Sequence, residues 1–186
     1  SMLSQSENIQ NVKKWKDWAW YIGFDEALVT TPREEGLVAS HGSLLGPPFI
    51  NEGGGENFFG VLGKSAIITP PKNSRRMLPG TKREVVMRLA RNLGIAVLEN
   101  EIPLSELEAL AAAAFSGTWT GFEGIRLIYD EHHPINPGKE LLVCYDPNDL
   151  VRLLHREYEA ITKGGKLASA ENEAVRRGIR TPILTL

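Results

Sequence analysis

Residues 49–84 read FINEGGGENFFGVLGKSAIITPPKNSRRMLPGTKRE. Two apolar runs in this stretch, residues 58–62 and 66–68, flank a short turn at Gly63 and Lys64. Apolar runs separated by a short glycine-containing turn are typical of a β-hairpin. The stretch therefore predicts a strand, a glycine turn, a hairpin and, at its end, the start of a helix.

Two turns in this stretch carry charged or polar groups. In the first, Glu52 and Glu56 enclose three consecutive glycines, whose backbone adopts positive φ angles without steric cost. In the second, Pro79 and Gly80 lead into residues 81–84, TKRE, whose T-x-x-E pattern is a capping box that opens a helix. A helix N-terminus offers unpaired N–H groups and a partial positive charge, and two cationic side chains lie beside this one. These features predict an anion site at the start of the helix.

Three helices are expected to follow the hairpin. Apolar residues recur at three- and four-residue spacing over 82–93, and Gly94 ends the pattern. A second capping box at Ser105–Glu108 predicts a helix over 105–113. An acid followed by proline, and then an apolar stripe, predict a helix over 148–163. Short strands are expected at 24–30, 95–98 and 125–129, and the irregular stretch 31–48 is expected to form a long loop.

The N-terminal segment 7–22 also has a helical pattern. Its apolar stripe is formed by Val12, Trp15, Ala19 and Ile22. The lysines beside the stripe would suit a helix lying in a membrane interface. A helix packed on the body of the protein explains the same stripe, and we adopt that interpretation because acidic residues dilute the charge.

The composition is that of one turn-rich globular domain. The 186 residues carry a net charge of −2, with 18 glycines and 11 prolines, so neither nucleic acid nor an anionic membrane is expected as a partner. Cys144 is the single cysteine, which excludes an internal disulfide and suits a reducing compartment. No apolar run is long enough to span a bilayer and no signal peptide is visible, so we predict a cytoplasmic protein. The histidines have no metal-ligand spacing, and no metal site is predicted.

The motifs INEGGGENFF, TPP, LPGTKRE and FSGTWTG, in that order, resemble the large domain of the class IV (fold type IV) pyridoxal-phosphate enzymes. These enzymes include the branched-chain and D-amino-acid aminotransferases and aminodeoxychorismate lyase. The resemblance runs from about Gly23 to Gly165. It implies an α/β fold with a barrel-like, mostly antiparallel sheet flanked by the three helices, and it makes a homodimer the expected assembly.

The resemblance also implies a cofactor site for pyridoxal 5'-phosphate. Glu52 matches the glutamate that faces the pyridine nitrogen, although an exposed acid at a turn is the alternative. Thr81, Lys82 and Thr118 match the phosphate-binding positions. The family usually has a hydroxylated residue where Lys82 stands, so Lys82 is either a point charge for a phosphate or a solvated first-turn residue. Trp119 occupies a position that the family keeps small, beside the substrate carboxylate, and a core role is its alternative.

The imine-forming lysine of the family has no counterpart at the expected place. Counting back from Gly23 by the family's spacing leads to the vicinity of Ser4, and no lysine precedes Lys13. The family's small N-terminal domain also has no counterpart in this sequence. Since the lysine is both covalent anchor and base, we do not expect transamination by this chain alone, and no residue is assigned as catalytic.

We therefore expect one aminotransferase-like large domain over residues 1–165 and a C-terminal tail over 166–186 that wraps around the domain or a partner. Three hypotheses for function remain. The first is a truncated class IV enzyme or pseudoenzyme whose activity, if any, is that of an aminotransferase or aminodeoxychorismate lyase. The second is a non-catalytic module that binds a small phosphorylated ligand. The third is a dimerising interaction protein built on the same domain.

Overall fold

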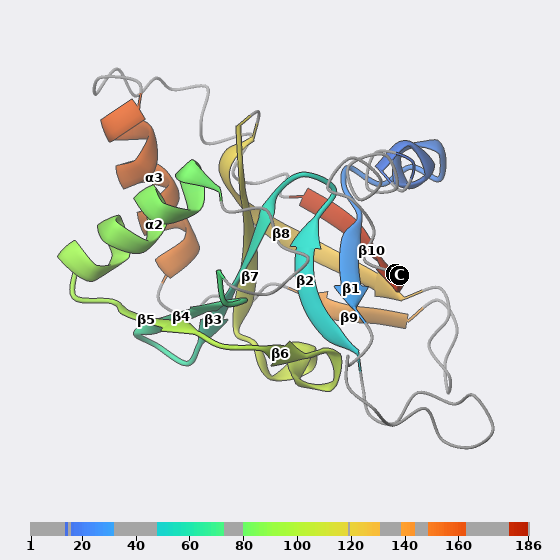
Figure 1. The fold of residues 1–186 in the computed structure, drawn as a ribbon, viewed down its shortest axis with the longest axis horizontal. Helices are drawn as coiled ribbons and strands as arrows, with labels where there is room; N and C mark the ends of the chain where they lie inside the picture. The colour runs from blue at the N-terminus through green and yellow to red at the C-terminus, as the bar shows by residue number, and fades with distance from the viewer. Residues whose placement is uncertain are drawn as a thin grey trace.

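The computed structural model of the chain describes residues 14, 16–31, 48–72, 80–118, 120–130, 139–143, 149–162 and 179–185. Within these residues, ten strands form one sheet, and the helical elements are α2, α3, a 3-10 helix and part of an N-terminal helix (Figure 1). The strands are β1 (Leu28–Thr31), β2 (Phe49–Gly53), β3 (Asn57–Leu62), β4 (Ala66–Thr69), β5 (Ala96–Glu99), β6 (Ile102–Pro103), β7 (Ala112–Gly117), β8 (Gly121–Asp130), β9 (Lys139–Val143) and β10 (Ile179–Thr185). The helices are α2 (Thr81–Asn92), η1 (Leu104–Ala109) and α3 (Leu150–Thr162).

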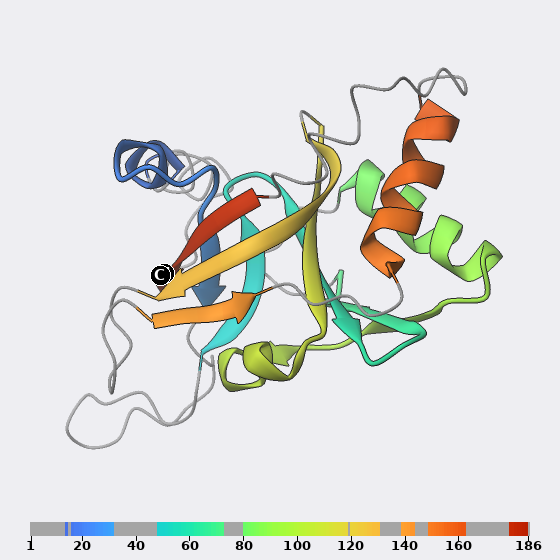
Figure 2. The same cartoon turned by 180° about the vertical axis from the view of Figure 1, so that it is seen from behind.

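The sheet closes on itself into a barrel. Its strand order is β5-β4-β3-β7-β8-β10-β1-β2-β6, with β9 beside β8. An additional pairing between β2 and β3 closes the strands β3-β7-β8-β10-β1-β2 into a ring. Most neighbouring strands are antiparallel, and the parallel pairs are β4–β5, β1–β10 and β8–β10. Seen from behind, β8, β9 and β10 form the wall of the barrel nearest the viewer, in front of β1 and β2 (Figure 2). The predicted barrel-like, mostly antiparallel sheet with flanking helices is confirmed.

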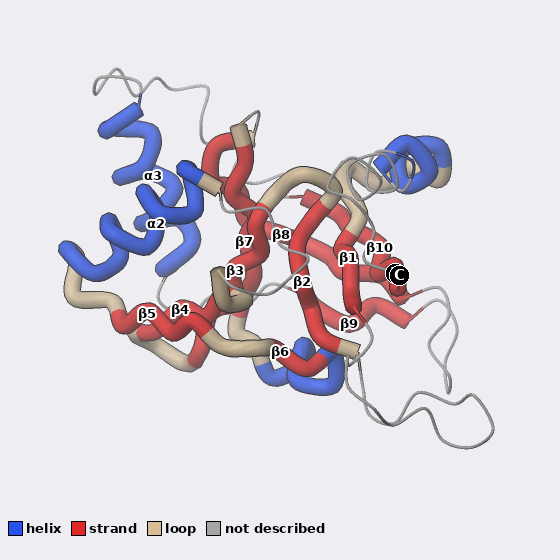
Figure 3. The backbone as a smooth tube through the Cα atoms, viewed as in Figure 1, coloured by secondary structure: helices blue, strands red, loops and turns tan. Residues whose placement is uncertain are grey.

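Alternation along β3 separates two apolar interiors. Phe58 belongs to the cluster inside the barrel and meets Phe115 of β7 edge-on, with ring centroids 6.1 Å apart. Phe59 points to the other face and meets Phe122 of β8, 5.7 Å away, in the cluster covered by α2 and α3. Because successive side chains of a strand point to opposite faces, one strand serves both interiors. The two helices lie side by side over the end of the sheet that contains β3, β4 and β5 (Figure 3).

Helix α2 confirms the predicted helix, but not its predicted cap. Gly80 is the N-cap residue, in an extended conformation and with no side-chain hydrogen bond to the helix, so Thr81 is the first helical residue. The buried Arg83 anchors this first turn. Its guanidinium donates to the carbonyl oxygen of Pro70 (2.8 Å) and pairs with Glu99 (2.8 Å). The turn is therefore held by an arginine from inside and not by a capping box.

The helix predicted over 105–113 is wrong in its second half. A 3-10 helix covers Leu104–Ala109, with Pro103 as its N-cap and no side-chain cap, and Ala112–Gly117 form strand β7. Strand β7 pairs with β3 on one side and β8 on the other. An alanine run favours a helix locally, but pairing with two neighbouring strands outweighs that weak preference.

Of the other predicted elements, some are confirmed, some lie outside the described residues, and one strand was missed. The hairpin is confirmed as β3 and β4, and the last predicted helix as α3. Its predicted cap at residues 146–148 lies outside the described residues, as does most of the long loop 31–48. No strand was predicted beyond residue 165, whereas Ile179–Thr185 form β10, between β8 and β1 in the sheet. The division into a domain and a tail stays a prediction.

The N-terminal helix is described over residues 16–21. Ala19 packs against Ala27 in a small cluster that Trp18 and Phe24 partly cover. Val12 and Trp15 of the predicted stripe lie outside the described residues. None of the helices described, including this one, is long and apolar enough to cross a membrane.

Candidate functional site

A row of polar side chains crosses three strands at one end of the barrel. Glu52 of β2 pairs with Asn57 of β3, and Asn57 pairs with Ser116 of β7. Ser116 in turn pairs with Phe122, which belongs to the cluster under the helices, so the row lies on the helix-facing side of the sheet. All three polar residues are buried. Strand pairing thus brings residues 52, 57 and 116 together from distant parts of the sequence.

A β-bulge turns Glu52 to this face. Val29 of β1 pairs with Glu52, but the next residue, Thr30, pairs with Ile50, so Asn51 is the extra residue. Ile50 lies inside the barrel. Without the bulge, Glu52 would point to the same side as Ile50, because residues two apart share a face. Glu52 is 4% exposed and stands next to Asn57 in the row.

The N-terminus of α2 lies over the same row. The backbone of Gly80 comes so close to the side-chain oxygen of Asn57 that a Cβ at residue 80 would clash with it. Helix α2 starts at the next residue without a side-chain cap. The hydroxyl of Ser116, which is 1% exposed, has no hydrogen-bond partner among the described residues. A helix start and an unsatisfied buried hydroxyl therefore meet at one place, which suits an anionic ligand.

Thr118 follows the end of β7, two residues beyond Ser116, and is exposed. Gly117 of β7 pairs with Gly121 of β8, so Thr118 and Thr120 lie in the short connection between these two strands. Register therefore brings Glu52, the start of α2 and the strand end that carries Thr118 to the same end of the sheet. Trp119 lies outside the described residues.

Lys82 points toward α3. Its ammonium nitrogen lies 5.9 Å from the centroid of the Tyr158 ring, a contact within the range of cation–π attraction. Tyr158 is buried in the helix-side cluster. The contact holds the lysine between the two helices, and its role toward a phosphate stays a prediction.

Sequence reasoning missed a charged cluster beside this row. The buried carboxylate of Glu26 accepts hydrogen bonds at Oε1 from the N–H groups of Ala27 (2.8 Å) and Gly54 (3.0 Å). Its Oε2 accepts one from Lys16 Nζ (2.6 Å). This arrangement ties the N-terminal helix to the triglycine turn. The only sequence signal was the adjacent pair Asp25 and Glu26, which gives no hint of the contact with residue 54.

Glu56 is the second carboxyl group of this cluster. The three-glycine turn brings it round, with Gly55 at φ +119° and the Gly53 N–H donating to the carbonyl oxygen of Glu56 (2.6 Å). Burial and, next, the neighbouring charge of Glu26 raise the pKa of Glu56 to about 7, against the opposing effects of Thr120 and Lys16. Its Oε2 has no hydrogen-bond partner among the described residues. The sequence marked Glu56 as one of two acids around the glycines but assigned it no role.

Lys16 does not provide a free amine. Burial lowers its pKa, but the hydrogen bond and the charge of Glu26 outweigh burial and raise the pKa above the ordinary lysine value. The side chain is therefore protonated at neutral pH, whereas an imine-forming lysine must react as the neutral amine. Lys16 is an ion-pair partner in this structure.

The other candidate sites are less well formed. The described residues hold no cluster of three His, Cys, Asp or Glu side chains that could bind a metal ion. The Nδ1 of His155 lies 2.5 Å from the carbonyl oxygen of Phe122, which fixes that ring against β8. His132, His133 and Cys144 lie outside the described residues.

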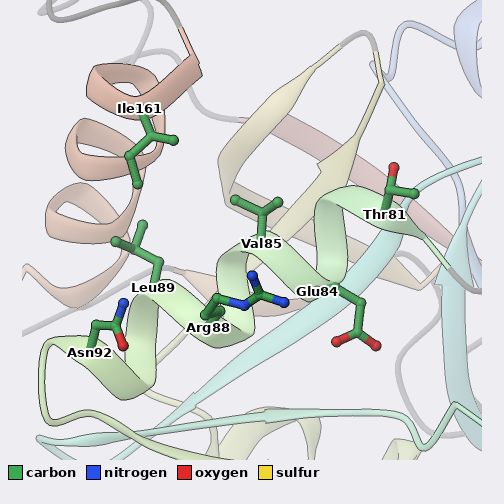
Figure 4. A pocket seen from close by; sticks show the side chains of 7 residues that line it. All are labelled: Thr81, Glu84, Val85, Arg88, Leu89, Asn92 and Ile161. Atoms are coloured by element: carbon green, nitrogen blue, oxygen red, sulfur yellow. The ribbon is translucent and has the colours of Figure 1, made fainter.

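A pocket of about 440 Å³ opens between α2 and α3 (Figure 4). Its wall contains three apolar side chains, Val85, Leu89 and Ile161. Thr81, Glu84, Arg88 and Asn92 complete the lining. This pocket contains neither Glu52 nor Thr118, so it is separate from the polar row.

Comparison with known proteins identifies relatives for most of the fold. A family model described as amino-transferase class IV matches residues 10–128. The branched-chain-amino-acid aminotransferase of Mycobacterium tuberculosis is 42% identical over 67 residues, which cover 35% of this chain and 18% of that protein. The Escherichia coli enzyme of the same name is 32% identical over 80 residues, covering 43% of this chain and 25% of that protein.

Solved structures of similar fold cover more of the chain. The branched-chain aminotransferase from Thermoproteus uzoniensis, solved with norvaline, superposes with a TM-score of 0.61 at 26% identity, over 85% of this chain and 44% of that one. The Thermobaculum terrenum enzyme in its PLP form has a TM-score of 0.62 at 23% identity, over 88% and 45%. The chain thus spans less than half of these structures and about a quarter or less of the curated relatives that it matches.

Proposed function

The chain belongs to the class IV aminotransferase family, and from this premise we propose that it binds pyridoxal 5'-phosphate, or a smaller phosphorylated ligand, without forming an imine. The single observation that supports the proposal best is the convergence of Glu52, the uncapped start of α2 and the unsatisfied hydroxyl of Ser116 at one end of the sheet. Such an arrangement offers an acid, helix N–H groups and a hydroxyl donor.

The residues present fit the cofactor in part. In the proposed site, Glu52 holds the proton of the pyridine nitrogen, and the N–H groups of Thr81 and Lys82 and the hydroxyl of Thr118 bind the phosphate. Trp119 lies outside the described residues, and its place on the substrate side stays a prediction. The cofactor, when bound, would supply electron withdrawal from a substrate amine. Lys16, beside the polar row, is held protonated by Glu26, and Lys82 lies against the ring of Tyr158, so the proposal assigns no covalent step to this chain.

The test is uptake of pyridoxal 5'-phosphate by the purified full chain, followed by absorbance and by tryptophan fluorescence. We expect saturable binding that dialysis reverses, and no lysine adduct after borohydride reduction and peptide mass analysis. Pyridoxal without its phosphate serves as the matched ligand and is expected to bind at least tenfold more weakly, about the loss of one charge-assisted contact. Fixation to one lysine would contradict the non-covalent proposal and favour an active aminotransferase or lyase.

A second candidate function, pairing of subunits, is favoured by one surface feature. Trp20 and Tyr21 are 73% and 89% exposed at the end of the N-terminal helix. Exposed neighbouring aromatic residues are enriched where proteins associate. Sedimentation of the chain and of its Trp20→Ala variant tests a homodimer, and a monomer at all concentrations would exclude it. We further propose that the protein acts in the cytoplasm, consistent with its single cysteine.

A further inference from the structure

The pocket between α2 and α3 has a floor of core side chains (Figure 4). Leu89 is 7% exposed and belongs to the helix-side cluster, and Val85 packs against that cluster. Ile161, in the last turn of α3, is 61% exposed and points across the pocket toward Leu89. The volume of about 440 Å³ lies within the usual range for small-molecule sites. A ligand with an apolar body would therefore cover an isoleucine that the described residues leave exposed.

Polar side chains of α2 complete the lining of this pocket. Their spacing of three or four residues puts them on one face of the helix, and they are Thr81, Glu84, Arg88 and Asn92. Arg88 is exposed, and the described residues offer it no ion-pair partner. The other two arginines of this helix, Arg83 and Arg91, both pair with Glu99. Arg88 therefore keeps its charge available at the mouth of an apolar pocket.

The charges at this mouth favour a ligand with a single negative group. A guanidinium binds a carboxylate through two parallel hydrogen bonds. Glu84 lies one turn before Arg88, and its own carboxylate pairs with Lys72 at 3.5 Å. Because Glu84 would repel a second negative charge, the mouth suits a carboxylate better than a phosphate ester, which carries close to two charges. Asn92, one turn beyond Arg88, adds an amide that can donate to the same anion.

We propose that the pocket between α2 and α3 binds a small amphipathic monocarboxylate, with its apolar chain between Leu89 and Ile161 and its carboxylate on Arg88. This second site goes beyond the proposed function, because it shares only Thr81 with the proposed phosphate site. A second copy of the chain that inserted an apolar side chain here is the competing occupant, and the oligomeric state distinguishes it.

Octanoate is the probe, and octanol is the matched ligand without the charge. Each is titrated at neutral pH into the full chain, and amide chemical shifts report where it binds. We expect saturable octanoate binding, with shifts concentrated in α2 and in the last turn of α3. Octanol is expected to bind about tenfold more weakly, the loss of one charge-assisted contact. From butanoate to octanoate, each added methylene is expected to tighten binding about two- to fourfold.

Exposed positions allow substitutions that leave the core intact. Arg88→Gln removes the charge and is expected to weaken octanoate binding about tenfold while leaving octanol binding unchanged. Arg91→Gln, one turn further along the same helix and outside the pocket lining, is the matched control and should change neither. Ile161→Ser removes the exposed apolar wall and should weaken both ligands about fivefold. Thermal unfolding of each variant checks that the fold is retained.

Four results would overturn the inference. The first is absence of octanoate binding, and the second is an equal loss in Arg88→Gln and Arg91→Gln, which would reflect net charge alone. The third is a set of octanoate shifts at the exposed Trp20 and Tyr21 instead of α2, which would mean adventitious binding. The fourth is a dimer that Ile161→Ser dissociates, since the pocket would then be an interface between copies. None of these results bears on pyridoxal 5'-phosphate binding, which is measured separately.

Discussion

The two ends of the sheet bury different kinds of side chain. Under α2 and α3, most of the buried side chains are apolar, among them Phe59, Met87 and Leu154, and Arg83, His155 and Glu159 are the buried polar residues of these helices. At the end where β2, β3 and β7 meet, Glu26, Glu52, Glu56, Asn57 and Ser116 are buried instead. Burial of apolar surface stabilises a fold, whereas burial of carboxyl groups and unsatisfied hydroxyls opposes it. Buried carboxyl groups and hydroxyls that oppose folding, yet are retained at one end of the sheet, mark that end as the functional one. The apolar end supplies the stability.

The largest effect on this comparison is expected from a substitution at the apolar end. Replacing Phe59 by alanine removes a fully buried ring that packs on Phe122, and we expect a loss of about 3–5 kcal/mol in the free energy of unfolding. Denaturant unfolding measures it. Ile161→Ala, at an exposed position of α3, is the control and should cost well under half as much. A loss below about 1 kcal/mol for Phe59→Ala would mean that the helix layer is not the stabilising half.

Arg83 joins the two halves, because it ties the start of α2 to the sheet. Arg83→Ala leaves Glu99 and the Pro70 carbonyl oxygen without this partner, and we expect a loss of about 2–4 kcal/mol in stability. Phosphate-ligand binding should weaken with it, since the helix start loses its anchor. Arg91→Ala is the matched control, because Arg91 pairs with the same Glu99 at 3.6 Å but is exposed. Equal losses in the two variants would contradict the anchoring role.

At the polar end, Glu56 makes the free energy of unfolding depend on pH. Its folded-state pKa of about 7 is higher than the ordinary 4.5, so the native protein binds more protons than the unfolded chain between these values and loses stability as pH rises through them. Glu56→Gln does not titrate. We expect its stability relative to the wild type to rise by about 2–3 kcal/mol from about pH 4 to about pH 8. Urea unfolding at several pH values checks this, and a constant difference would show that Glu56 is ionised normally.

The smallest effect concerns Glu52, at the polar end. Glu52→Gln removes the negative charge facing the proposed pyridine nitrogen while keeping the shape of the side chain. We expect pyridoxal 5'-phosphate to bind about tenfold more weakly, or about 1.4 kcal/mol, and sulfate to bind unchanged. Fluorescence titration with both ligands separates the ring contact from the phosphate contact. If sulfate binding weakened to the same extent, Glu52 would act at the phosphate group and not at the ring.

The local elements were largely predictable, because their signals lie within short windows. Alternating apolar runs around Gly63 gave the hairpin, and the spacing from residue 82 to 93 gave α2. The alanine-rich stretch before Ser116 was misassigned, because its strand character comes from pairing with β3 and β8. The roles assigned to the site residues stay predictions. The structure places Glu52 and the start of α2 at one end of the sheet, whereas the direction of Lys82 toward Tyr158 was not expected.

By itself, the sequence determined the hairpin, the helix that begins after Gly80 and the presence of two acids around a flexible turn, since period and turn chemistry are local properties. Only the tertiary structure decided that a bulge turns Glu52 to the helix-facing side, that Lys16 is bound to Glu26 and that Glu56 is buried among acids. Strand register and desolvation depend on segments far apart in the chain, and a short window of residues carries neither.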